Sequence, residues 1–251
     1  MDEASPGSTS TLSLRHGSRR TGAKITVLAY TWTWNDGYSY SFATLDRFGT
    51  LLSVVPYPDG VPVSYPRPAL SPDGTQLAWI AGQVPSLHIA NLDGTLVQDI
   101  RFDSLTSASG DVAWSSDGRS VAYVTWHTDR LIPYPYQYTN IRLVTRRLSD
   151  GFTRPVAALA STAGAPAWSR DGRWLTITAG GSIHRVRADG NGSEQVLYDG
   201  GLVGARSSAW GPRDSLVAIS AGSGVVLLHP DGGSPRTLAA EGSVVSLGWA
   251  E

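Results

Sequence analysis

The chain has 251 residues, 41% of them hydrophobic, and a formal net charge of −1 at pH 7. This length allows a sizeable core, and the near-zero charge argues against a nucleic-acid partner, because phosphate binding needs a basic surface. Cysteine is absent, which excludes disulfides, thiolate catalysis and cysteine-ligated zinc. No stretch approaches about 18 consecutive apolar residues, so we expect no membrane-spanning helix.

The first part of the chain is poor in structural signals. Residues 1–23 are rich in serine, glycine and arginine and have neither hydrophobic periodicity nor the apolar core of a signal peptide. They predict a flexible leader or linker in front of a single domain over residues 24–251. Segments 25–30, 41–45 and 51–55 then predict three strands, because they are rich in β-branched and aromatic residues.

A repeat of about forty residues organises the rest of the chain. The anchors of successive copies lie 44, 54, 42 and 39 residues apart and are Leu70, Trp114, Trp168, Trp210 and Trp249. The clearest copies read AWSSDG at residues 113–118 and AWSRDG at residues 167–172. In the first four copies a tight turn follows the anchor, and the next strand begins with an apolar residue seven positions after it. Repeats of this length with four short strands are typical of β-propeller blades.

The remaining strands recur in order within each copy. Second strands are predicted at 76–81, 120–126, 174–179 and 216–220, and third strands at 87–92, 141–148, 183–188 and 225–229. Short fourth strands follow, such as 195–198 and 236–238. Ten of the seventeen aspartates precede a glycine directly. Because turns that need positive φ select Asp-Gly, we interpret these aspartates as turn residues rather than catalytic ones.

The sequence predicts an all-β, five-bladed β-propeller. The expected blades cover residues 24–56 with 244–251, then 67–101, 111–158, 165–198 and 206–240. The first blade lacks its innermost strand, and we expect the final segment, 244–249, to fill that position and close the ring without exposed edges. The alternative is a six-bladed propeller truncated at the start of its last blade.

The repeated pattern A-W-S-x-D-G, followed by a strand and by a third strand that ends in Asp-Gly, resembles the repeats of TolB-like β-propellers. These repeats occur in periplasmic TolB proteins and in the propellers of prolyl-oligopeptidase-type peptidases. The resemblance covers about residues 25–251, with two departures: Leu70 replaces the tryptophan, and WGPRDS at 210–215 lacks the Asp-Gly turn. It implies a docking platform and suggests an extracytoplasmic location, although the residues themselves do not reveal the compartment.

Long loops gather on one face of the predicted propeller, over blades one to three, at residues 31–40, 56–68 and 126–138. We call this surface the aromatic loop face; its candidate binding residues are Trp32, Trp34, Tyr38, Tyr40, Tyr57, Tyr65, Trp126, Arg130, Tyr134, Tyr136 and Tyr138. Large amphipathic aromatics suit protein interfaces and sugar-stacking sites. Three interpretations stay open: packing of the loops alone, a protein or peptide surface, and a carbohydrate or other small-ligand platform.

Catalysis has a single well-placed candidate. The chain has no G-x-S-x-G motif, so the peptidase activity of the resembling proteins is not expected here. A glycosidase needs two or three converging carboxylates, and only Asp111, just before a first strand, is well placed near the central funnel. Asp103, Asp129 and Glu241 are weaker partners. We therefore assign no catalytic residue and keep Asp111 as a candidate ligand-binding residue.

We therefore predict a non-catalytic binding module for a protein or peptide, either a monomer or part of a longer polypeptide. The alternative is a carbohydrate-binding or glycoside-hydrolase-like propeller. The histidines show no metal-ligand spacing, so we expect neither a zinc site nor another cofactor. A calcium ion in the central channel, held by aspartate and carbonyl oxygens, stays open.

Overall fold

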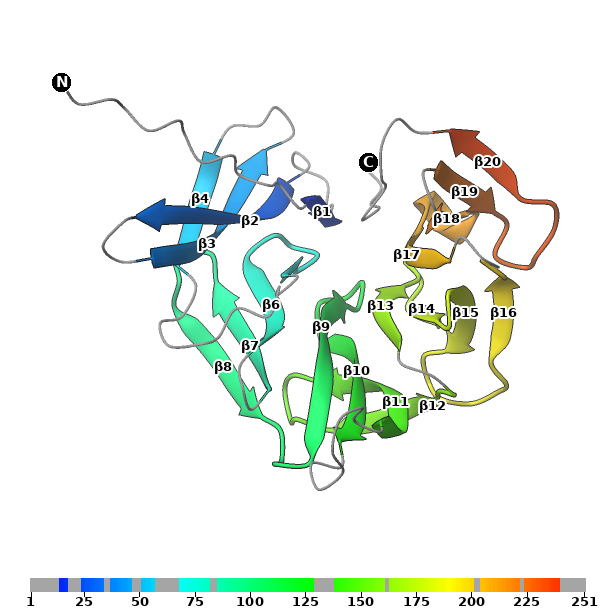
Figure 1. The fold of residues 1–251 in the computed structure, drawn as a ribbon, viewed down its shortest axis with the longest axis horizontal. Coiled ribbons are helices and arrows are strands. Elements are labelled where there is room, and N and C mark those ends of the chain that lie inside the picture. The colour runs from blue at the N-terminus through cyan, green and yellow to red at the C-terminus, as the bar shows by residue number, and fades with distance from the viewer. Residues whose placement is uncertain are drawn as a thin grey trace.

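The computed structural model describes residues 14–17, 24–33, 37–46, 51–56, 68–81, 85–128, 138–160, 163–200, 204–221 and 224–239. These residues form five four-stranded antiparallel sheets, and in each sheet neighbouring strands are consecutive in the chain. The sheets follow one another around a common centre (Figure 1). This all-β arrangement is consistent with a β-propeller.

The strands of the first two sheets are β1 (Leu14–Gly17), β2 (Lys24–Thr33), β3 (Gly37–Asp46), β4 (Leu51–Pro56), β5 (Ala69–Leu70), β6 (Gln76–Ala81), β7 (Ser86–Asn91) and β8 (Leu96–Arg101). The third sheet contains β9 (Thr106–Trp114), β10 (Ser120–Thr128), β11 (Tyr138–Arg147) and β12 (Thr153–Ala158). The fourth contains β13 (Ala163–Trp168), β14 (Trp174–Ala179), β15 (Ser182–Arg187) and β16 (Gln195–Tyr198). The fifth contains β17 (Ala205–Trp210), the 3-10 turn η1 (Pro212–Asp214), β18 (Val217–Ala221), β19 (Gly224–Leu228) and β20 (Arg236–Ala239).

The seven-residue spacing of the repeat corresponds to a cross-strand pair. Each of the four anchors within the described residues lies directly opposite the apolar residue seven positions later, in the pairs Leu70–Leu77, Trp114–Val121, Trp168–Leu175 and Trp210–Val217. The first strands of neighbouring sheets contact one another from β1 to β17 and lie toward the centre (Figure 1). The predicted second, third and fourth strands are confirmed to within a few residues at their ends.

The prediction for the innermost strand of the first sheet was wrong. β1 pairs with β2, with Leu14 opposite Val27 and Gly17 opposite Lys24, and β3 pairs with the other edge of β2. A segment of the predicted flexible leader therefore holds the position expected for residues 244–249. Only residues 18–23 separate β1 from β2, so this pairing needs a short loop rather than closure over the whole chain. Residues 240–251 lie outside the described residues, and the five-blade count stays a prediction.

The Ser-x-Asp-Gly turns share one hydrogen-bond pattern. In the fourth sheet, Ser169 Oγ donates to Asp171 Oδ1 at 2.7 Å and accepts from the Trp174 N–H at 2.9 Å. Asp171 Oδ1 also accepts from the Arg173 N–H at 2.9 Å. The second and third sheets repeat these contacts at Ser71 with Asp73 and at Ser115 with Asp117. These hydrogen bonds confirm the prediction that Asp73, Asp117 and Asp171 are turn residues.

The turn of the fifth sheet that lacks Asp-Gly, at residues 210–215, is hydrogen-bonded to the fourth sheet. Arg213 and Asp214 in η1 have φ values of 56° and 55°. The Asp214 carboxylate accepts from the Arg170 N–H at 2.6 Å and from the Asp171 N–H at 2.9 Å. The loss of the Asp-Gly signal is therefore accompanied by a hydrogen-bonded link to the turn of the fourth sheet.

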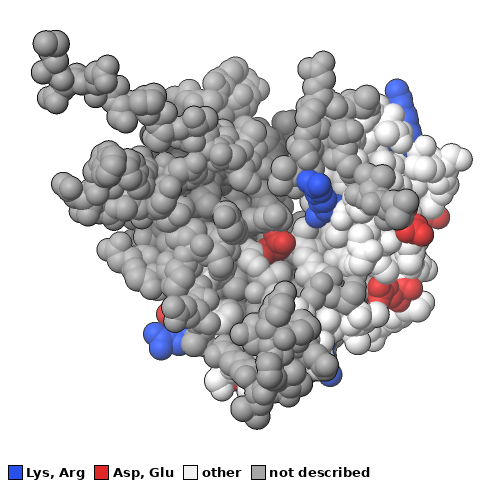
Figure 2. Space-filling view, in the orientation of Figure 1, with Lys and Arg blue, Asp and Glu red and all other residues white. Residues whose placement is uncertain are grey.

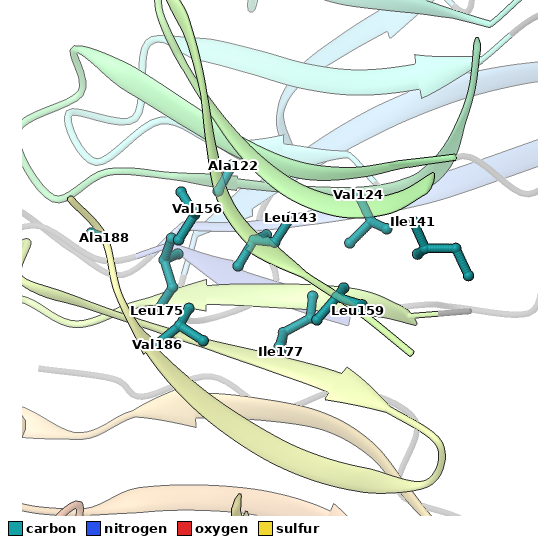
Figure 3. Close-up of a cluster of buried hydrophobic side chains, with 10 residues drawn as sticks. All are labelled: Ala122, Val124, Ile141, Leu143, Val156, Leu159, Leu175, Ile177, Val186 and Ala188. Carbon is teal, nitrogen blue, oxygen red and sulfur yellow. The ribbon is translucent and has the colours of Figure 1, made fainter. Parts of the chain in front are cut away.

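Apolar side chains fill the spaces between neighbouring sheets. Between the third and fourth sheets, Val124 and Leu143 pack against Leu175 and Ile177 (Figure 3). Trp114 belongs to the equivalent cluster between the second and third sheets, and its indole N–H donates to the Ala69 carbonyl at 2.9 Å. Within the described ranges, no helix is long and apolar enough to cross a membrane.

Candidate functional site

The hairpin of β10 and β11 carries the part of the aromatic loop face that the structure describes best. Thr128 pairs with Tyr138 and His127 with Thr139, so both strands run into the segment that the sequence analysis assigned to a loop. The connection is shortened to residues 129–137, which lie outside the described residues. Strand geometry therefore positions Trp126 and Tyr138, the two ends of the predicted loop.

Trp126 and Tyr138 form an aromatic pair at the end of this hairpin. Their ring centroids lie 5.7 Å apart with an interplanar angle of 75°, an edge-to-face arrangement. Trp126 is half-buried and packs against the core between the third and fourth sheets, whereas Tyr138 is 46% exposed. The core thus holds one ring, and that ring supports an exposed second one.

A β-bulge lies directly beside this pair. Thr125 is opposite Arg142 and His127 is opposite Thr139, so Asn140 is an extra residue on β11 with φ 54°. Bulges re-aim side chains, and asparagine tolerates positive φ better than most residues. The sequence analysis singled out neither Asn140 nor Arg142. The only available signal was an asparagine inside a run of strand-forming residues.

The first sheet places aromatic positions on a second hairpin. Trp32 lies opposite Tyr38, and Tyr30 lies opposite Tyr40. Because alternate residues of a strand share a face, all four positions fall on one face of the β2–β3 hairpin. The predicted insertion 31–40 is therefore mostly hairpin, with residues 34–36 outside the described part.

Several predicted site residues are not covered by the structure. Trp34, Tyr57, Tyr65, Arg130, Tyr134 and Tyr136 lie outside the described residues. Convergence of the whole aromatic loop face therefore stays a prediction. In Figure 2, the charged atoms of the described residues are scattered and form no continuous patch of one sign.

Asp111, the candidate carboxylate of the funnel, lies inside β9 rather than before it, because β9 begins at Thr106. The Ala165 N–H donates to Asp111 Oδ2 at 3.0 Å, and Ala165 has φ 49° within a bulge of β13. A Cβ at Gly164 would lie 2.9 Å from the same oxygen, so glycine permits this approach. Asp111 therefore joins the first strands of the third and fourth sheets.

The candidate partners of Asp111 do not form a catalytic pair in the described structure. Asp103 Oδ1 accepts from the N–H groups of Leu105 and Thr106, at 3.0 and 2.8 Å. Hydrogen bonding to the Thr106 side chain lowers the pKa of Asp103. Asp129 and Glu241 lie outside the described residues. Among the residues described, no group of three histidine, aspartate or glutamate side chains could hold a metal ion.

Asp111→Ala should lower the free energy of unfolding by about 1–2 kcal/mol, because the buried Ala165 N–H would lose its acceptor. Asp111→Asn keeps a carbonyl oxygen at this position and should lose less than half as much. Urea unfolding of both variants at neutral pH measures the difference. Equal losses in the two variants would contradict the proposed hydrogen-bonding role.

No protein-family model and no curated protein matches this chain. Solved structures do match it. A protein assigned as a TolB from Agrobacterium tumefaciens aligns with a TM-score of 0.58 and 17% identity, over 83% of this chain and 78% of that one. TolB from Acinetobacter baumannii aligns with a TM-score of 0.59 and 17% identity, over 87% of this chain and 52% of that one. The fold resembles the TolB-like β-propellers.

A third match is a chain of a solved nidogen/laminin complex, with a TM-score of 0.62 and 14% identity. The alignment covers 90% of this chain and 81% of that one. The chain spans about half the length of the A. baumannii TolB. At these identities the likeness concerns the propeller fold, and function has to be argued from the residues of this chain.

Proposed function

We propose that this propeller is a non-catalytic module that binds a protein or peptide through the aromatic loop face. The observation that carries the proposal is the Trp126–Tyr138 pair, in which a core-anchored ring supports a ring that is 46% exposed. A propeller of similar fold occurs in a nidogen/laminin complex, which supports protein binding as a use of this architecture.

The aromatic pair has the physical properties of an interface anchor. Tyrosine and tryptophan contribute large contact areas, and few of their torsions have to be fixed on binding. The edge contact with Trp126 already restricts the Tyr138 ring, so little further entropy is lost when a partner packs against it. The strand positions on both sides of the bulge add rigidity that a free loop would lack.

Tyr138→Ala should weaken binding of a peptide ligand about 10-fold or more, as expected for loss of an interface anchor. The ligand is obtained by selecting a displayed library of short random peptides against the immobilised chain, and binding is measured by calorimetry. Thermal unfolding should change little, because Tyr138 is exposed.

Phe152→Ala is the matched control, because Phe152 is also half-exposed but lies next to the Asp150-Gly151 turn, at the opposite end of β11. It should bind within about twofold of the parent, since it removes no interface contact. Failure to select any peptide, or equal losses in the two variants, would contradict the proposal. A glycan array screened in parallel distinguishes carbohydrate binding from the proposed peptide binding.

A further inference from the structure

Arg142 is an exposed arginine whose side chain is nevertheless held in place. Its Nε–H donates to Asn140 Oδ1 at 2.6 Å. Asn140 Nδ2 in turn lies 3.5 Å from His127 Nε2, across the hairpin. Asn140 occupies the bulge with φ 54°, and this backbone conformation brings its side chain to Arg142. A local chain of polar contacts therefore orients the guanidinium plane.

The two terminal nitrogens of Arg142 have no carboxylate partner among the described residues. Three other exposed arginines are paired with a turn aspartate at 2.8 Å: Arg147 with Asp150, Arg173 with Asp171, and Arg187 with Asp189. A guanidinium whose Nε is already bonded still offers its Nη1–Nη2 edge, and that edge matches the two oxygens of a carboxylate.

Arg142 and the aromatic pair lie on the same hairpin end. Arg142 is directly opposite Thr125, the neighbour of Trp126 in β10. Because successive residues of a strand point to opposite faces, the guanidinium and the Trp126 ring flank the hairpin on its two sides. Tyr138 contacts the Trp126 ring, so a partner segment that reaches both Tyr138 and Arg142 has to pass around the end of the hairpin.

We propose that Arg142, positioned by Asn140, binds a carboxylate of an acidic peptide segment in the partner protein. This inference rests on the proposed peptide-binding function and adds the chemistry of the partner, an aspartate or glutamate side chain in the same segment that packs on Tyr138. Pre-orientation of the guanidinium reduces the rotamer entropy lost on binding, which is otherwise large for arginine.

The test uses peptides selected from the same random library on the complete chain, on Arg142→Gln and on Arg236→Gln. Arg236 is an exposed arginine of β20, so its variant matches the charge change away from the hairpin. Peptides selected on the parent should be enriched in aspartate and glutamate. Arg142→Gln should lose this enrichment and bind the acidic peptides about 10-fold more weakly, whereas Arg236→Gln should retain both properties.

A second variant tests the positioning role of Asn140. Asn140→Gly tolerates the positive φ but removes the acceptor for Arg142, so we expect a loss of about threefold in affinity for the acidic peptides and none for their Asn/Gln-substituted counterparts. Peptides that bind without acidic enrichment, or equally to Arg142→Gln, would overturn this inference and leave the proposed function intact. Failure to select any peptide would overturn both.

Discussion

The triple variant Ser71→Ala/Ser115→Ala/Ser169→Ala should lose about 3–6 kcal/mol of unfolding free energy, at about 1–2 kcal/mol for each site. All three serines are buried, and each hydroxyl donates to a turn aspartate while it accepts a backbone N–H. Substitution by alanine removes the buried hydroxyl, so the turn aspartate loses a hydrogen-bond donor and the backbone N–H loses its acceptor. The sites lie in three different sheets, so we expect the losses to add.

This loss should depend on pH because the turn aspartates have shifted pKa values. At Asp171, partial burial acts to raise the pKa, but hydrogen bonds from the Arg173 N–H and Ser169 and the charge of Arg173 outweigh it and lower the pKa. The pKa values of Asp73 and Asp117 are lowered in the same sense. Their ionised forms therefore stabilise the fold above the unfolded pKa of about 3.9, and this contribution is lost as pH falls through the folded pKa.

Urea unfolding at neutral pH and at pH values below about 4 measures both effects. The difference in unfolding free energy between the parent and the triple variant should become smaller at acidic pH. The parent loses the stabilisation by the ionised turn aspartates there, and the variant already lacks part of that stabilisation. Ser193→Ala, at an exposed serine in the connection between β15 and β16, is the control and should unfold like the parent. A triple variant as stable as the parent would show that the turn hydrogen bonds are not the source of stability.

Leu143→Ala should lower the free energy of unfolding by about 2–5 kcal/mol, the range for removal of a buried leucine side chain. Leu143 is 0% exposed and lies in the cluster that joins the third and fourth sheets (Figure 3). Its neighbours come from opposing strands of a hydrogen-bonded framework, so they cannot collapse fully into the space that the substitution leaves. Chemical unfolding followed by tryptophan fluorescence measures the loss.

Val97→Ala provides the control for this substitution. Val97 is 45% exposed on the outer strand β8, and its truncation should change stability by no more than about 0.5 kcal/mol. If Leu143→Ala lost no more unfolding free energy than Val97→Ala, the side chains between the third and fourth sheets would be able to repack freely. That result would contradict the close-packed arrangement between sheets.

Part of the candidate site could be predicted from the sequence. Trp126 and Tyr138 were expected on one loop face because the repeat register placed residues 126–138 between a second and a third strand. The register does not reveal that the extended strands bring the two rings into contact, because the bulge at Asn140 depends on cross-strand hydrogen bonding. The tethered guanidinium of Arg142 followed only from that local geometry.

The sequence by itself determined the repeating sheet, because its signals are local: an apolar residue seven positions after each of the first four anchors, and Asp-Gly turns that need positive φ. The tertiary structure alone decided which segment completes the first sheet, where Leu14–Gly17 pairs with β2. It also assigned Asp111 to a bond with Ala165, fifty-four residues away in the chain. Such choices depend on which groups meet in space and on the loop entropy of bringing them together, and neither quantity is written in a local pattern.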